Sequence, residues 1–169
     1  GFRAPTLFEL NFDQFGVTPN PDLQPERANG YDAGIEKEVG GFLVRATYFR
    51  QVVKDQIDFD FAGGGYFNID RVKSRGVEVE ADWVAGDFLQ THIAYSFIDA
   101  TDQSTGLAIL RTPKHSGAAT ITLRPTPAFS VSSTLAFNGR ESDFPAPNRS
   151  FVKLDIRAAY ALSEALEIY

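Results

Sequence analysis

Three acidic residues, Glu78, Glu80 and Asp82, are spaced two residues apart in this sequence. Their carboxylates are candidates for chemistry because the spacing brings them together. Paired carboxylates can act as a general acid and a general base, and their oxygens can also hold a cation. Residues two apart on a β-strand point to the same face, so these three would form one row. Such a row is typical of the hydrated face of a strand, and we interpret it in that way rather than as a catalytic site.

Other patterns that could bind a metal ion or activate a nucleophile are incomplete. The two histidines, His92 and His115, lie 23 positions apart in different settings. The segment His115–Gly117 lacks the G-x-S-x-G elbow of serine hydrolases. Neither a Lys-Ser/Thr pair nor a helix follows the glycines at 63–65, as a phosphate-binding loop would require. The sequence therefore predicts no catalytic residue, no metal site and no cofactor, and the protein is not expected to be an enzyme.

A stretch rich in aromatic side chains is the best candidate for ligand binding. Aromatic rings provide contact area at a low cost in conformational entropy, and nearby cations attract an anionic ligand. Two alternatives stay open: the rings pack on one another or on the rim, and the cations pair with Asp70, with Asp99 or with lipid phosphates. The candidate ligand-binding residues are Phe59, Phe61, Tyr66, Phe67, Arg71 and Arg111, with Lys73 as a further cation near the same end.

The strand expected to organise these residues is Arg75–Trp83, R-G-V-E-V-E-A-D-W. Its apolar side chains, Val77, Val79, Ala81 and Trp83, all fall on one side, and the three carboxylates fall on the other. In a soluble sheet the apolar side faces the core, whereas in an outer-membrane barrel it faces lipid and the polar side faces the lumen. The alternation alone leaves both possibilities open.

Composition sets limits on the fold and on the partners. The chain has 169 residues, 43% hydrophobic and 22% charged, which suits one folded domain. No apolar run approaches the roughly 18 residues of a membrane-spanning helix, so a membrane role would need strands. The net charge of -6 argues against nucleic acid, because phosphate backbones are bound by clustered Lys and Arg. Without cysteine the chain has no disulfide framework and no thiolate metal site.

Alternating apolar and polar residues predict further strands separated by turns. Gly40-Gly41 indicates a two-residue hairpin, because glycine supplies the positive φ that such a turn needs. The register follows, with Val39 opposite Phe42, Glu36 opposite Arg45, Ile35 opposite Ala46 and Ala33 opposite Tyr48. The other predicted strands are Tyr31–Val39, Phe42–Val53, Phe88–Ile98, Gly117–Arg124, Phe129–Asn138 and Phe151–Ala161.

The segment before the first long strand is expected to be mostly irregular. Residues Gly1–Leu10 predict the end of a strand followed by a helical turn, with Thr6 as its cap and Glu9 three residues later. Residues Asn11–Asn29 predict a loop, because the prolines within them lack the N–H that a β-ladder needs. The chain starts without methionine and stops inside an apolar-polar run, so we expect it to be a piece of a longer chain.

The predicted connections alternate strictly between long and short. In an up-and-down sheet this gathers the tight turns at one end and the long loops at the other, as in bacterial outer-membrane barrels, whose strands need about 9–11 residues to cross the hydrocarbon. The long connections are Lys54–Ser74, Asp99–Ser116 and Gly139–Ser150, and the short ones are Gly40-Gly41, Ala85–Asp87, Pro125–Pro127 and Ser163-Glu164. Aromatic girdle positions are expected at Tyr31, Tyr48, Trp83, Tyr95, Phe97 and Tyr160.

Four motifs follow one another along the chain. They are F-R-A-P-T-L-F-E-L at Phe2–Leu10, N-P-D-L-Q-P-E at Asn20–Glu26, R-G-V-E-V-E at Arg75–Glu80 and R-T-P-K-H-S at Arg111–Ser116. Gly30-Tyr31 and Gly34-Ile35-Glu36 follow the second of them. In this order and at these spacings the set resembles the C-terminal part of the barrel in TonB-dependent outer-membrane receptors. The resemblance covers nearly all of the chain.

The resemblance implies an all-β, antiparallel, up-and-down transmembrane β-barrel, of which residues 1–169 form a C-terminal portion. About seven to eight strands of a plugged barrel of about 22 strands would be present, and the plug domain and the last strands would be absent. It further implies a Gram-negative outer membrane, with lipid around the barrel. The function implied is energised uptake of a scarce ligand, most often a ferric siderophore or similar iron chelate, otherwise haem or a cobalamin-type ligand. The TonB complex would act through the missing plug.

Two other interpretations stay open. A self-contained outer-membrane barrel of about eight strands, with a structural or adhesion role, predicts a sheet that closes on itself. A soluble β-barrel carrier predicts that Val77, Val79 and Ala81 point into a closed core while the acids between them point outward.

Overall fold

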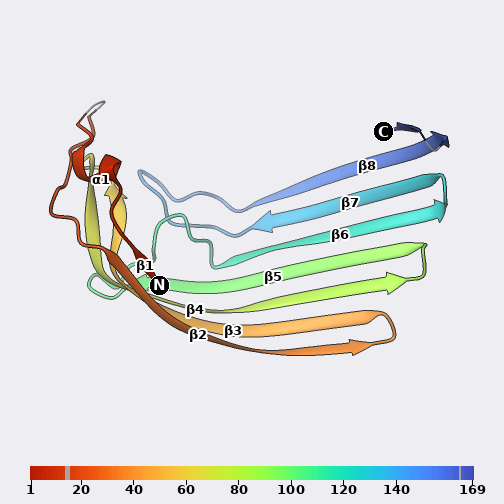
Figure 1. The fold of residues 1–169 in the computed structure, drawn as a ribbon, viewed down its shortest axis with the longest axis horizontal. Helices are drawn as coiled ribbons and strands as arrows, with labels where there is room; N and C mark the ends of the chain where they lie inside the picture. Colours follow the sequence, from red (N-terminus) through yellow and green to blue (C-terminus); the bar gives the residue numbers. More distant parts are fainter. Residues whose placement is uncertain (14–15, 164) are drawn as a thin grey trace.

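The fold is a single antiparallel sheet whose strands follow one another in sequence order (Figure 1). The computed structural model describes residues 1–13, 16–163 and 165–169. Its strands are β1 (Phe2–Arg3), β2 (Glu26–Val39), β3 (Phe42–Asp60), β4 (Gly65–Ala85), β5 (Leu89–Asp102), β6 (His115–Thr126), β7 (Phe129–Asn138), β8 (Phe151–Ser163) and β9 (Leu166–Ile168), and one short helix, α1, spans Leu7–Asn11. Within the described ranges no helix has the length and apolar character to cross a membrane.

The tight turns gather at one rim of the sheet and the long connections at the other, as predicted (Figure 1). The β2–β3 turn uses Gly40 and Gly41 at φ 58° and 79°, in the left-handed region that favours glycine. The predicted β2–β3 register is confirmed at all four pairs, from Val39 opposite Phe42 to Ala33 opposite Tyr48. The predicted turn at Ser163-Glu164 includes Glu164, which lies outside the described residues.

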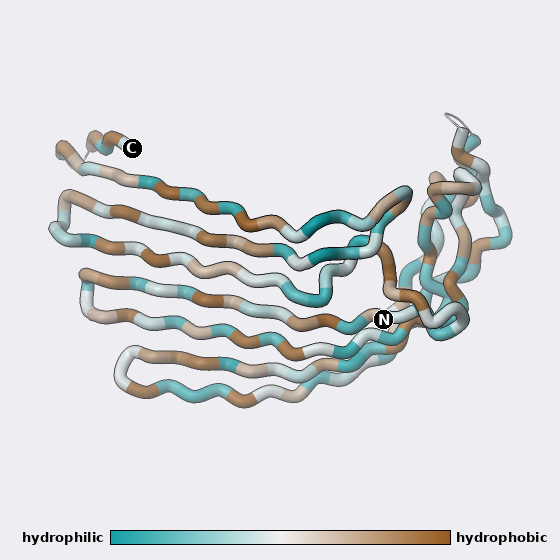
Figure 2. Tube along the Cα trace, turned by 180° about the vertical axis from the view of Figure 1, so that it is seen from behind, coloured by the Kyte–Doolittle hydropathy of each residue, from teal (hydrophilic) through white to brown (hydrophobic). Residues whose placement is uncertain are grey.

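The two faces of the sheet sort by parity, as the sequence predicted. Val77 lies between Tyr48 on β3 and Phe97 on β5, and Trp83 lies between Phe42 and Thr91. Figure 2 shows the resulting alternation of apolar and polar positions along the strands. We call the face that carries Val77 the outward face. Its exposed large apolar side chains are Tyr31, Ile35, Val39, Phe42, Val44, Tyr48, Val77, Trp83, Ile93, Tyr95, Ile121, Leu135, Phe137, Val152, Leu154, Ile156 and Tyr160.

The outward face has no second layer of protein over it within the described residues. Ile35 is 79% exposed and Val152 is 68% exposed. A water-soluble domain would bury such side chains, so the interpretation as a soluble carrier with a closed core is wrong. The strand order also places β1 and β9 at opposite edges, so the described residues do not form the closed ring expected of a self-contained barrel.

The predicted long connection Lys54–Ser74 is wrong, because most of it is strand. β3 continues to Asp60 and β4 begins at Gly65, so only residues 61–64 turn. The pair projects past its neighbours and carries the N-terminal segment beside it (Figure 1). Most of the buried apolar side chains gather around this extension: Leu23, Ile57, Ile69, Val72 and Ala100. Its hydrogen bonds to the N-terminal segment, described below, keep strand structure in a stretch with a loop-like composition.

Other predicted strands are also too short at the ends near the long-loop rim. β2 begins at Glu26, inside the predicted loop Asn11–Asn29, and β5 continues to Asp102, so the connection after it is shorter than predicted. β6 begins at His115 rather than Gly117. The predicted bounds of Phe129–Asn138 and the start of the last long strand at Phe151 are confirmed.

Candidate ligand-binding site

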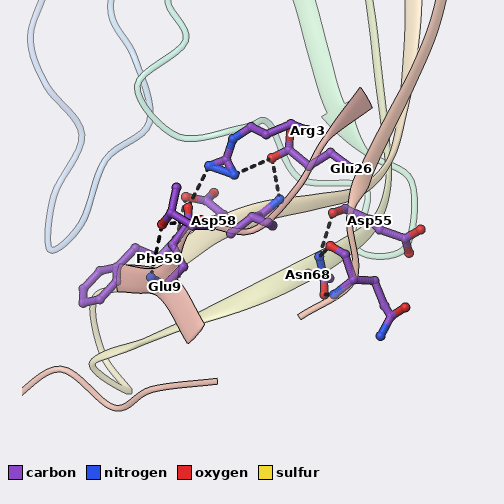
Figure 3. Close-up of polar contacts among 10 residues, drawn as sticks. Arg3, Glu9, Glu26, Asp55, Asp58, Phe59 and Asn68 are labelled. Atoms are coloured by element: carbon purple, nitrogen blue, oxygen red, sulfur yellow. Dashed lines mark hydrogen bonds and ion pairs between the residues drawn. The ribbon is translucent and has the colours of Figure 1, made fainter. Parts of the chain in front are cut away.

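The site at the long-loop rim is built on a brace formed by the N-terminal segment (Figure 3). Thr6 caps α1 in a capping box: its Oγ1 accepts from the Glu9 backbone N–H at 3.2 Å, and its own backbone N–H donates to Glu9 Oε2 at 2.7 Å. The buried Glu9 carboxylate also accepts from the Arg3 guanidinium at 2.7 Å. A short helix is marginal alone, so these contacts fix α1 in place.

A second set of polar contacts joins this brace to the β3–β4 extension (Figure 3). Glu26 Oε1 accepts from the Ile57 backbone N–H at 2.9 Å and lies 3.6 Å from Arg3. Asn68 Nδ2 donates to the backbone carbonyl oxygens of Gln24 at 3.0 Å and of Asp55 at 2.7 Å. β2 begins only at Glu26, so it does not pair with the outer part of β3. The side chains of Glu26 and Asn68 supply hydrogen-bond partners to β3 backbone groups there.

Aromatic rings continue the contact from the brace to the tip of the extension. Phe8 on α1 meets Tyr66 edge-on at 6.2 Å between centroids, and Tyr66 meets Phe59 at 5.1 Å. Phe59 then meets Phe61 at 5.2 Å. Edge-to-face pairs at these distances are favourable geometries for aromatic rings. Part of the predicted aromatic group therefore does pack on itself, as one alternative expected.

The same rings line an apolar pocket of about 300 Å³ at the loop rim. Phe59, Phe61 and Phe67 are among its walls, and Tyr66 stands behind Phe59 without lining it. The opposite walls come from connections that the sequence analysis left out: Leu107, Ala108, Ile109 and Leu110 between β5 and β6, and Phe144 between β7 and β8. The signal that could have revealed them is the apolar run L-A-I-L inside a loop.

Arg111 joins three connections at the edge of this pocket. Its guanidinium lies 4.4 Å above the Phe61 ring centroid, and its Nε donates to Asp143 Oδ1 at 3.1 Å. Its backbone N–H donates to the Ser142 carbonyl oxygen at 2.8 Å. The pKa of Asp143 lies below its ordinary value, chiefly because the Phe144 backbone N–H donates to it, and Arg111 adds to this. Arg111 is thus paired with Asp143 rather than with Asp70 or Asp99.

The charged side chains in the pocket lining itself are all acidic. Asp58, Asp60 and Asp102 belong to its lining. Arg71 and Lys73 do not belong to its lining, although Phe67 on the same strand does. Across the part of the chain that the structure describes, no three His, Asp or Glu side chains come together in a way that could hold a metal ion. The arrangement suits an apolar or aromatic group better than a bare ion.

Comparisons with known proteins agree with this architecture. Residues 1–169 match the family model described as TonB dependent receptor-like, beta-barrel. The chain is 27% identical over 173 residues to the Vitamin B12 transporter BtuB of Vibrio vulnificus (strain YJ016). The aligned region covers 99% of this chain and 27% of that protein. The structure of the Copper transporter OprC superposes on 96% of this chain with a TM-score of 0.77 and 17% identity, over 27% of the length of OprC.

A ferric enterobactin receptor, PfeA from Pseudomonas aeruginosa, superposes on 96% of this chain with a TM-score of 0.76 and 18% identity, over 29% of its own length. The chain therefore spans about a quarter of the proteins that it matches. The family consists of receptors and transporters of the Gram-negative outer membrane and not of enzymes. The chain belongs to the TonB-dependent receptor family, as part of its outer-membrane β-barrel.

Proposed function

We propose that the protein containing this chain is an outer-membrane receptor that takes up a scarce ligand with energy from the TonB complex, acting through a plug. The observation that carries the proposal is the apolar, aromatic-walled pocket at the long-loop rim of a barrel of this family. Long loops of outer-membrane barrels face the outside of the cell, so a pocket there meets ligand first.

The first candidate ligand is a ferric siderophore or a similar iron chelate. Catecholate and other aromatic groups of such chelates can pack against Phe61 and Phe67, which are 38% and 40% exposed. The names of several structural neighbours include iron chelates or iron, which supports the same class.

A cobalamin-type ligand is the second candidate, and the charge of the pocket favours it. Asp58, Asp60 and Asp102 repel an anionic chelate, and Asp143 already pairs with Arg111, the cation nearest the rings. Cyanocobalamin carries no net charge, so these carboxylates do not repel it. The relative with 27% identity is named as a vitamin B12 transporter, which points in the same direction.

Binding of two probes, ferric enterobactin and cyanocobalamin, to the purified full-length receptor tests the proposal. Phe61→Ala and Phe67→Ala each remove a ring that lines the pocket, and we expect about tenfold weaker binding of the preferred probe, equivalent to about 1.4 kcal/mol. Phe88→Ala is the matched control, because Phe88 is also exposed but lies at the tight-turn rim.

Four outcomes separate the possibilities. Preferential binding of ferric enterobactin supports the iron chelate, and preferential binding of cyanocobalamin supports the second candidate. If Phe61→Ala and Phe67→Ala bind the preferred probe as tightly as Phe88→Ala does, the pocket is not the binding site. Uptake of the bound probe that persists in cells lacking TonB would contradict energised transport.

A further inference from the structure

Cations gather on the outward face of the sheet along its long-loop rim. Strand register decides which side chains share that face, because residues paired across neighbouring strands point the same way. Arg50 pairs with both Tyr31 and Arg75, and Arg75 pairs with Asp99. We call the following residues the outward basic belt: Arg27, Arg50, Lys54, Arg71, Lys73, Arg75 and Lys114.

The belt lies directly beyond the apolar band of the same face. Tyr48, Val77 and Phe97 form the row next to it on the tight-turn side. The nine residues from Phe42 to Arg50 begin at the tight-turn rim, and about 9–11 residues of a tilted strand cross the hydrocarbon layer. The belt therefore lies where the hydrocarbon ends and the lipid headgroups of the outer leaflet begin.

Aromatic side chains mark the same boundary. Tyr31 and Tyr48 lie 6.4 Å apart between ring centroids, and Tyr95 hydroxyl lies 2.8 Å from His115 Nδ1. Aromatic residues with polar tips favour the membrane interface. Long basic side chains at such a level extend their charged ends toward the headgroups.

The belt carries more positive charge than its acids neutralise. Asp99 accepts from Arg75 at 3.3 Å and lies 3.1 Å from Lys114. In the described part of the chain, no carboxylate lies within 4.0 Å of the side-chain nitrogens of Arg27, Arg50, Lys54, Arg71 or Lys73. This excess contrasts with the net charge of -6 for the whole sequence, so it is a local feature of one rim.

A small hollow of about 160 Å³ lies within the belt. Lys73 and Arg75 contribute cations to its wall, and Thr101 and Gln103 contribute a hydroxyl and an amide. Ammonium, guanidinium, hydroxyl and amide N–H groups are all donors to the acceptor oxygens of a phosphate group. Asp99 also belongs to the wall, but it is engaged by Arg75 and Lys114.

We propose that the outward basic belt binds the phosphate groups of outer-leaflet lipids, with the hollow between Lys73 and Arg75 as its centre. The lipid's acyl chains lie along the apolar band beside Val77 and Tyr48, which continues from the belt without interruption. The binding is specific to one rim: among the described strand residues of the outward face, Lys37 is the one cation outside the belt.

Lipid retention by the full-length protein in nanodiscs tests the proposal. The nanodiscs contain dioleoylphosphatidylcholine doped with lipid A that carries two phosphates, or with dephosphorylated lipid A, and native mass spectrometry reports the lipid A retained. Each lost cation near an anionic lipid surface weakens attraction about fivefold. We therefore expect Lys73→Gln to retain diphosphorylated lipid A about fivefold less well and Lys73→Gln/Arg75→Gln about 25-fold less well.

Two controls keep the test independent of folding. Lys37→Gln removes the same charge from the same face near the other rim and should leave retention unchanged, and Lys73→Arg should preserve it. Equal retention of both forms of lipid A, or no effect of the double substitution, overturns the proposal. Inorganic phosphate that displaces lipid A at low millimolar concentration would overturn it in favour of a free-phosphate site. Binding of ferric enterobactin or cyanocobalamin plays no part in these outcomes.

Discussion

Gly76, in the middle of β4, has no room for any side chain. A Cβ built there meets the backbone carbonyl oxygen of Phe97 on β5, and it lies 2.6 and 2.7 Å from two ring carbons of Phe49 on β3. Real Cβ atoms essentially never approach another heavy atom within 3.0 Å. The Phe49 ring can turn aside, whereas the Phe97 carbonyl can move only with its strand. Overpacking costs about 1–3 kcal/mol, and we expect Gly76→Ala to lie near the upper value.

Amide hydrogen exchange of the full-length protein in lipid bicelles measures this cost. Since about 1.4 kcal/mol corresponds to a factor of ten, a loss of about 3 kcal/mol in local opening free energy accelerates exchange of the β4 and β5 amides more than 100-fold. Gly30→Ala is the control, because the nearest atom to a Cβ there is the Arg50 carbonyl oxygen at 3.0 Å. It should change exchange far less.

A double substitution locates the strain. Phe49→Ala/Gly76→Ala removes the ring contacts but leaves the contact with the Phe97 carbonyl, so exchange should recover only in part. Complete recovery would show that the ring alone sets the cost. Unchanged exchange in Gly76→Ala itself would refute the whole account of the close β4–β5 approach.

Three further predictions concern other parts of the chain. Val79→Arg on the outward face should destabilise the barrel in lipid vesicles by about 2–4 kcal/mol in urea unfolding, whereas Ala94→Arg, beside Glu80 on the opposite face, should be tolerated. Glu9→Ala removes the capping box and the partner of Arg3 and should cost about 2 kcal/mol locally, so trypsin should cleave faster at Arg3. Because the pKa of Asp143 is lowered, its ion pair with Arg111 is fully present above the ordinary carboxyl pKa of about 3.9 and is lost as the pH falls through the lowered value. Spin labels on the two loops should then separate between pH 7 and strongly acidic solution, and Asp143→Asn should abolish that dependence.

Local patterns were sufficient to predict the membrane-spanning part of the sheet. Gly40-Gly41 fixed one register because a two-residue turn leaves no freedom in strand pairing. The parity of Val77 and Val79 predicted the exposed apolar face, because strand side chains alternate. The cap at Thr6 and Glu9 was predictable because the capping box is local in sequence.

The extension of β3 and β4 could not be predicted in the same way. Its strands depend on hydrogen bonds from distant residues, such as Thr18 N–H to the Gly64 carbonyl oxygen at 2.7 Å and Asn20 Nδ2 to the Tyr66 carbonyl oxygen at 2.9 Å. The pocket likewise depends on contacts between residues that are distant in sequence. Phe59, Phe61 and Phe67 in its wall belong to the aromatic group singled out from the sequence. Phe144 and the pairing of Arg111 with Asp143 could not be predicted, because they join connections far apart in sequence.

Strand order equal to sequence order makes each hairpin a complete segment of the wall. When a hairpin is duplicated or deleted, two strands are added or lost together, so the chain leaves the change running in its original direction. Side chains that faced lipid still face lipid, and each loop stays on its own rim. The girth of such a wall can therefore change through evolution in steps of two strands, without rewiring any existing pair. Variation in loop length, by contrast, concentrates at one rim, where it changes the walls of the pocket and leaves the strands of the barrel intact.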